Sequence, residues 1–314
     1  MTLSTDLSAA LDSALDYGDP AMSALSGRLP LDRLDRLRTL LTVYDLYAAP
    51  LPSLGARARW QHHPAVADLK SRLEADWIAE LDARPVPALP ADAVAALRAL
   101  AARDRLPAAY RWLAKEASWP EVVSFLALEG GPDAGFDDLV AVGQVGLAGS
   151  AKMELATNYW DEMGNGDPAA VHTVLHDRLV QAVRMPRIPR AEQPVEALER
   201  TALGGLLSTN RWLQPELLGA LGLIELQAGP RCRLVLQAFD RLAAPAAAYP
   251  FYEVHAEVDP RHGKDWLEKA VGPTVAELPD WAPRVIRGAW WRSAVNAAFF
   301  AVVPQLLSQR RSAA

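Results

Sequence analysis

Residues 31–48 read LDRLDRLRTLLTVYDLYA, and their apolar positions follow a helical period. Leucine and tyrosine side chains recur every three or four residues, at Leu31, Leu34, Leu37, Leu40, Leu41 and Tyr44. That spacing places them on one face of an amphipathic α-helix. Residues 91–102, ADAVAALRALAA, are rich in alanine and leucine, the strongest helix formers. Because we find no convincing run of alternating β-branched residues, we predict an all-α protein.

Proline-containing segments divide the predicted helices. RPVPALP at 84–90 is a stiff, extended connector. We therefore predict an N-terminal helical extension over residues 1–84 and a helical bundle over residues 91–314. Gly229-Pro230 is predicted to end the helix before it, whereas Pro260 either kinks a helix or begins a new one. The extension is open to two roles, capping the bundle or mediating a homodimer.

The composition limits the class of protein. The 314 residues are 51% hydrophobic, enough to bury one large core or two ordinary ones. The net charge of −6 argues against a nucleic-acid partner, which usually meets a basic face. A single cysteine, Cys232, excludes intramolecular disulfides and cysteine-ligated metal clusters. Without a secretory signal or a sufficiently long apolar stretch, the sequence predicts a cytoplasmic protein and no membrane partner.

The segment FYEVHAEVDPRHGKDWL (251–267) carries two of the six histidines. At about 100° per residue, Asp259 and His262 lie within about 40° of His255 around a helix, so the three side chains share a face. Two imidazoles and a carboxylate on one stripe suit iron, manganese or zinc. The competing interpretation is a solvated polar face that binds no metal.

A second set of polar residues lies in KMELATNYWDEMGNG (152–166). Glu154 and Asp161 are seven residues apart and share a helix face, while Glu162 lies about 80° around from Glu154. A glycine-rich turn separates them from His172 in the next predicted helix. The alternative is that these acids are exposed charges near a helix end.

Glu225 stands alone among leucine, isoleucine and glycine in ELLGALGLIELQAG (216–229). A carboxylate in such surroundings is costly to bury unless it is paired, hydrogen-bonded or ligated. Antiparallel helices can point acids and histidines into one shared core, which is how helical diiron carboxylate sites are built. The sequence therefore indicates a candidate metal site formed by distant segments.

The motifs E-L-x-x-N-Y-W-D-E-M-G-N-G (154–166), V-H-T-x-L (171–175) and Y-E-V-H-x-x-x-D-x-x-H-G (252–263), together with Glu225, resemble those of a known family. This family is the haem-oxygenase-like diiron oxidases and oxygenases, often described as iron-containing redox enzymes. The resemblance covers roughly residues 110–275. It implies a haem-oxygenase-like helical bundle that holds two non-haem iron ions and uses O2 as a co-substrate.

The resemblance also implies which residues bind the two iron ions. Carried over onto this chain, the ligands are Glu154, either Asp161 or Glu162, Glu225, His255, Asp259 and His262. His172 is a ligand, a hydrogen-bond donor to a ligand, or neither, and Glu129 is a candidate extra carboxylate. Hydrogen bonds that fix the histidine tautomers are expected from Asn158, Tyr252 and Asp265.

The implied function is an O2-activating oxidase or oxygenase acting on a small organic substrate. N-oxygenation, desaturation and oxidative C–C cleavage are all open reaction types. A haem enzyme is disfavoured because no histidine lies near residues 1–30, and Cys232 fits a small packed hydrophobe better than a thiaminase-like nucleophile. The alternative function is not enzymatic: a non-catalytic helical scaffold or binding protein on the same fold.

Overall fold

The computed structural model describes residues 6–129 and 135–312, and within these residues it contains helices and no strand. The all-α prediction is confirmed. Helix α3 (Arg33–Ala48) is capped by Asp32, whose carboxylate accepts a hydrogen bond from the amide of Asp35 at 2.8 Å. Asp92 caps α6 (Ala93–Arg103) in the same way. Both caps satisfy amide groups that the first turn of a helix leaves free.

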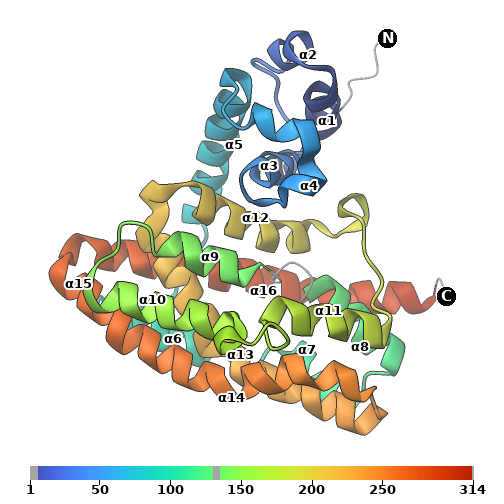
Figure 1. Ribbon diagram of the computed structural model, residues 1–314, viewed down its shortest axis with the longest axis vertical. Coiled ribbons are helices and arrows are strands. Elements are labelled where there is room, and N and C mark those ends of the chain that lie inside the picture. The colour runs from blue at the N-terminus through green and yellow to red at the C-terminus, as the bar shows by residue number, and fades with distance from the viewer. Residues whose placement is uncertain (1–5, 130–134, 313–314) are drawn as a thin grey trace. The chain divides into compact units, whose positions relative to one another are not determined.

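The chain divides into two compact units, each built from two stretches of sequence. The first unit comprises Met1–Pro85 and Pro189–Arg211, and the second comprises Val86–Ile188 and Trp212–Ala314. The α-helices of the first unit are α1 (Leu7–Tyr17), α2 (Asp19–Ser23), α3, α4 (Leu51–Leu54), α5 (Pro64–Asp82) and α12 (Val195–Thr209) (Figure 1). Those of the second are α6, α7 (Ala108–Lys115), α8 (Trp119–Glu129), α9 (Phe136–Gly143), α10 (Gly149–Glu162), α11 (His172–Val183), α13 (Gln214–Leu242), α14 (Tyr249–Asp265), α15 (Gly272–Glu277) and α16 (Ala282–Ser312).

Helix α12 packs with the N-terminal helices rather than with the helices that flank it in sequence. It lies against α3, and Gly205 allows this approach because a Cβ there would overlap the ring of Tyr44. The carboxylate of Glu199 on α12 is fully buried and pairs with Arg33 at 2.7 Å and with Arg84. The sequence prediction put this helix in the bundle because a helical period shows which face is buried but not which helices cover it.

Helix α13 is central to the second unit, where it packs against α6, α7, α14 and α16. It runs unbroken through Pro230, so the predicted end at Gly229-Pro230 is wrong. A Cβ at Gly229 would lie only 3.0 Å from Cδ of Pro260 on α14. Pro230 removes one backbone hydrogen bond from α13, which nevertheless continues as a helix and packs closely against α14 at this level.

Helix α14 also continues through a proline, Pro260. Of the two alternatives that the sequence left open, the structure therefore shows one continuous helix rather than a new helix capped by Asp259. This continuity places His255, Asp259 and His262 along a single helix. His255 and Asp259 are separated by about one turn, or about 6 Å along the axis.

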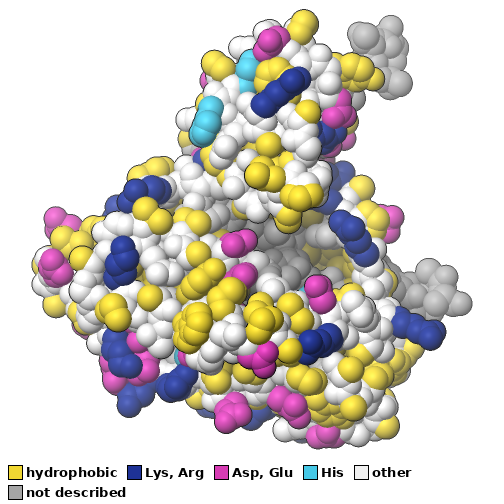
Figure 2. Space-filling view, in the orientation of Figure 1, with side chains coloured by type: hydrophobic (Ala, Val, Ile, Leu, Met, Phe, Trp, Pro, Cys, Tyr) yellow, Lys and Arg dark blue, Asp and Glu magenta, His cyan; other side chains and the backbone are white. Residues whose placement is uncertain are grey.

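The surface of α9 and α10 carries exposed hydrophobic side chains (Figure 2). Val142, Met153 and Trp160 are the largest of those on these two helices. Across the described part of the chain, no helix combines the length and the apolar character needed to cross a bilayer.

Candidate metal centre

Helices α10, α11, α13 and α14 bring six metal-ligating side chains into two groups. The first group consists of Glu162, His172 and His255, and the second consists of Glu225, Asp259 and His262. Within each group, one potential ligand atom from each residue lies within 4.8 Å of the others. Helix α14 contributes to both groups.

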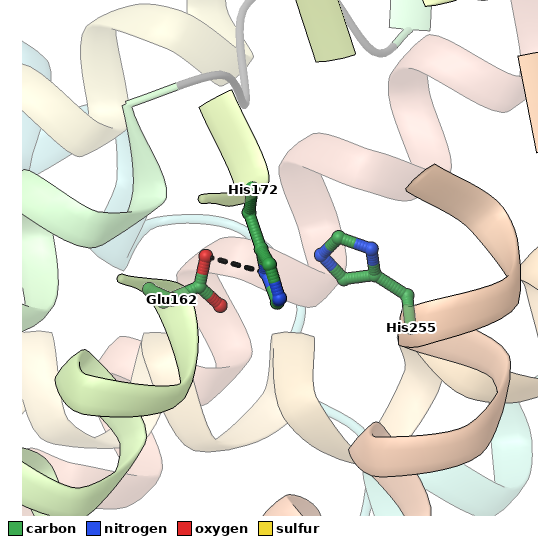
Figure 3. A group of neighbouring side chains, drawn as sticks. All are labelled: Glu162, His172 and His255. Carbon is green, nitrogen blue, oxygen red and sulfur yellow. Dashed lines mark ion pairs between the residues drawn. The ribbon is translucent and has the colours of Figure 1, made fainter. Parts of the chain in front are cut away.

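The first group joins the end of α10, the start of α11 and the middle of α14 (Figure 3). Nδ1 of His172 lies 2.8 Å from Oε2 of Glu162, and the rings of His172 and His255 have centroids 4.5 Å apart. Nδ1 of His255 donates a 2.6 Å hydrogen bond to the carbonyl oxygen of Phe251, which can only accept. Nε2 of His255 therefore keeps its lone pair, and Figure 3 shows one ring nitrogen of His255 pointing toward His172.

Burial sets the protonation state of His255. Burial, reinforced by the nearby His172, lowers the pKa of His255 to about 4. Its imidazole is neutral at neutral pH, the form in which histidine binds a metal ion. Glu162 and His172 are also buried.

The second group lies one turn further along α14 and faces α13. Glu225 is 4% exposed, and its Oε2 lies 3.6 Å from Nδ1 of His262. Asp259 and His262 are each 3% exposed. The carboxylate of Glu225 is thus buried within its apolar stretch. Burial of an isolated carboxylate is costly, and here two other potential ligands lie beside it.

Two buried polar atoms of the second group, Oδ2 of Asp259 and Nδ1 of His262, lack a hydrogen bond. In the first group, Nδ1 of His172 lies near Oε2 of Glu162 but not in hydrogen-bond geometry. An unsatisfied buried polar atom costs about 1–3 kcal/mol, so the two in the second group call for an explanation. Imidazole nitrogens and carboxylate oxygens are ligands of iron, and a bound cation would satisfy both atoms. The residues present therefore fit the iron that this type of bundle implies.

The charges of the two groups interact with each other. Burial, followed by the negative charges of Glu225 and Glu162, raises the pKa of Asp259 well above its ordinary value. Glu162 belongs to the first group, so its charge acts on a residue of the second, and the two groups adjoin along α14, where His255 and Asp259 are one turn apart. Three carboxylates clustered in a buried site create a strong demand for positive charge.

Two residues that the sequence predicted as ligands, Glu154 and Asp161, lie outside both groups. Glu154 is buried and lies 3.6 Å from Nζ of Lys269. Oδ2 of Asp161 lies 2.7 Å from Nε2 of His262 and 2.8 Å from Nη2 of Arg261. Of the neighbours Asp161 and Glu162, between which the sequence did not decide, the structure brings Glu162 together with two histidines.

The pKa values of Asp161 and His262 reflect this contact. Burial would raise the pKa of Asp161, but hydrogen bonds with His262 and Asn165 outweigh it and lower the pKa. Burial would lower the pKa of His262, but the negative charges of Glu225 and Asp161 outweigh it and raise the pKa to about 9. The two side chains therefore form an ion pair when no metal is bound.

The remaining candidates have other partners. Glu129 accepts a 2.8 Å hydrogen bond from the hydroxyl of Tyr110 and belongs to neither group. Asn158 hydrogen-bonds to Glu225 rather than to a histidine, and Asp265 pairs with Lys269 at 2.7 Å. The sequence analysis missed Arg261, and its only signal was a basic residue directly before His262 in the motif.

Histidines and carboxylates directed into the interior of an all-α bundle are the arrangement found in helical metal-binding proteins. A family model for iron-containing redox enzymes matches residues 123–297, more than half of the chain, and the chain belongs to this family. The match confirms the resemblance seen in the sequence motifs and spans both groups of potential ligands. A search of curated proteins found no match to the chain.

Proposed function

We propose that this iron-containing redox enzyme is a non-haem diiron oxidase or oxygenase that uses O2 to oxidise a small organic substrate. In this proposal the first group holds one iron ion and the second group holds the other. The observation that carries it is the pair of adjacent three-residue groups that share α14, in which every side chain is buried except the half-buried His255. N-oxygenation, desaturation and oxidative C–C cleavage remain the candidate reactions.

The two groups differ in ligand chemistry in a way that supports the proposal. The first group offers two imidazoles and one carboxylate, the set typical of non-haem ferrous oxygenases. The second offers one imidazole and two carboxylates, hard ligands that favour the ferric state. When bound, two iron ions supply two electrons for the reduction of O2.

The chain's own residues prepare the site for this chemistry. The neutral imidazole of His255 presents a lone pair without first losing a proton. Glu162, Glu225 and Asp259 are buried carboxylates that would supply negative charge to balance bound cations. Asn158 holds one oxygen of Glu225 by a 2.7 Å hydrogen bond.

Iron stoichiometry tests the proposal directly. Ferrous iron is added anaerobically to the apoprotein, unbound metal is removed, and iron per chain is measured; we expect about two ions. His255→Ala and His262→Ala each remove one ligand from a different group, so each variant should retain about one ion. His62→Ala is the matched control, because His62 is exposed and lies in the other unit.

Admission of air to the iron-loaded protein tests the use of O2. We expect the wild type to consume O2 with a transient visible absorption, and both site variants to lose most of this response. Retention of two ions by both site variants would refute the ligand assignment. Failure of the wild type to bind iron stoichiometrically would favour the non-catalytic scaffold instead.

A further inference from the structure

We propose that Asp161 is a positioning residue for the metal centre, not a ligand: it accepts the Nε2 proton of His262 and so directs Nδ1 of the same ring into the second group. This inference rests on the proposed function, because it assumes that the second group binds a metal ion. It goes further by assigning a role to a carboxylate outside both groups and by specifying which nitrogen of His262 is the ligand.

The first step is the position of His262 between two carboxylates. On one side, Nε2 lies 2.7 Å from Oδ2 of Asp161. On the other side, Nδ1 lies 3.6 Å from Oε2 of Glu225 and has no hydrogen-bond partner. Asp161 therefore engages Nε2, whereas Nδ1 makes no hydrogen bond and faces the second group, where a binding metal ion would displace its proton.

The second step is the tautomer that this arrangement selects. An ionised carboxylate can only accept a hydrogen bond, so the nitrogen next to Asp161 must carry the proton. A metal ion binds only a nitrogen with a free lone pair, which in this tautomer is Nδ1. Carboxylates that accept a proton from a ligating histidine fix its ring orientation and increase its basicity.

The third step is that Asp161 is itself held in place. Nη2 of Arg261, the residue preceding His262 on α14, donates to Oδ2 of Asp161 at 2.8 Å. The side chain of Asn165 also hydrogen-bonds to Asp161. Asn165 has a φ of 53°, in the left-handed region that asparagine tolerates better than most residues. These contacts hold the carboxylate of Asp161 toward His262.

The fourth step is the relation of Asp161 to its neighbour Glu162. The side chains of consecutive helical residues point about 100° apart, so they contact different neighbours. Glu162 joins the first group, whereas Asp161 reaches His262 of the second. The end of α10 thus supplies a ligand to one group and a supporting carboxylate to the other.

The test compares Asp161→Ala and Asp161→Asn with the wild type in anaerobic ferrous iron titrations. Loss of the acceptor in Asp161→Ala should weaken binding of one of the two ions by about 10–100-fold and leave the other unchanged. Asp161→Asn keeps a side-chain oxygen that accepts the Nε2 proton, so it should recover part of this affinity. Glu257→Ala is the matched control, because Glu257 is an exposed acid on α14, the helix that carries His262.

Histidine tautomers provide a second readout that a merely structural role would not change. In wild-type protein loaded with zinc and labelled with ¹⁵N-histidine, nuclear magnetic resonance should show His262 protonated at Nε2 and metal-bound through Nδ1. This measurement needs no variant, so it decides the matter even if Asp161→Ala fails to fold. The opposite tautomer would overturn the proposal.

The outcomes separate this inference from the proposed function. Two ions bound by the wild type and equally tightly by Asp161→Ala would overturn the role of Asp161 and leave the diiron proposal intact. Failure of the wild type to bind two ions would overturn the diiron proposal itself.

Discussion

Nδ2 of Asn158 donates a 2.7 Å hydrogen bond to Oε1 of Glu225, across 67 residues of sequence. Both side chains are buried, and the bond joins α10 to α13. With Oε1 engaged in this way, the other oxygen of Glu225 is the one that lies toward His262. A neutral amide thus orients the carboxylate of Glu225 toward His262.

We expect Asn158→Leu to lower the free energy of unfolding of the apoprotein by about 1–3 kcal/mol, because Oε1 of Glu225 would lose its donor in a buried site. Urea denaturation measures the change. Thr157→Ala, an exposed neighbour on the same helix, should stay within about 0.5 kcal/mol of the wild type. Equal stabilities for Asn158→Leu and the wild type would show that the bond does not contribute.

Gly219 on α13 and Gly288 on α16 allow these helices to pack closely. A Cβ at Gly219 would overlap the carbonyl oxygen of Val285, and one at Gly288 would overlap that of Glu216. Gly219→Ala and Gly288→Ala should each destabilise the fold by about 1–3 kcal/mol or more, because the helices must separate. Thermal and urea unfolding test this. Gly135→Ala, where a Cβ meets open space, is the control and should be far milder.

Cys232 is buried, and burial, followed by the charges of Asp259 and Glu129, raises the pKa of its thiol well above the ordinary value. Because the thiolate is the reactive form, we expect Ellman's reagent to label Cys232 only when the protein unfolds. Cys232→Ala should bind as much iron as the wild type. Rapid labelling of the native protein would instead revive a nucleophilic role for this residue.

The sequence predicted the helices better than it predicted their partners. The apolar stripe of residues 31–44 predicts α3 because helical periodicity is a local property. The end predicted at Gly229-Pro230 is wrong because the fit between α13 and α14 is a tertiary property that no local signal reports. The same limit applies to α12: a helical period indicates which face of a helix is buried, but it does not indicate which helices pack against that face.

The candidate site shows a similar division. The spacing of His255, Asp259 and His262 correctly places them along one face of a helix, but the structure assigns His255 to one group and the other two residues to the second. Helical geometry alone did not decide between Asp161 and Glu162. Their surroundings depend on the position of α14 relative to α10, which brings His262 to Asp161 and His255 near Glu162.

The pH dependence of the apoprotein's stability should reflect His176, which lies against the ring of Phe251 with centroids 5.1 Å apart. Burial lowers the pKa of His176, although the charges of Asp177 and Glu129 oppose the shift. A folded-state pKa below the unfolded value of about 6.5 means that the unfolded chain binds the proton first as pH falls. Stability contributed by neutral His176 is therefore complete above about pH 6.5 and decreases on acidification, by at most about 1.4 kcal/mol per pH unit. Urea denaturation of the wild type and of His176→Gln between pH 7.5 and pH 5 should show the shallower dependence in the variant, and parallel curves would contradict the prediction.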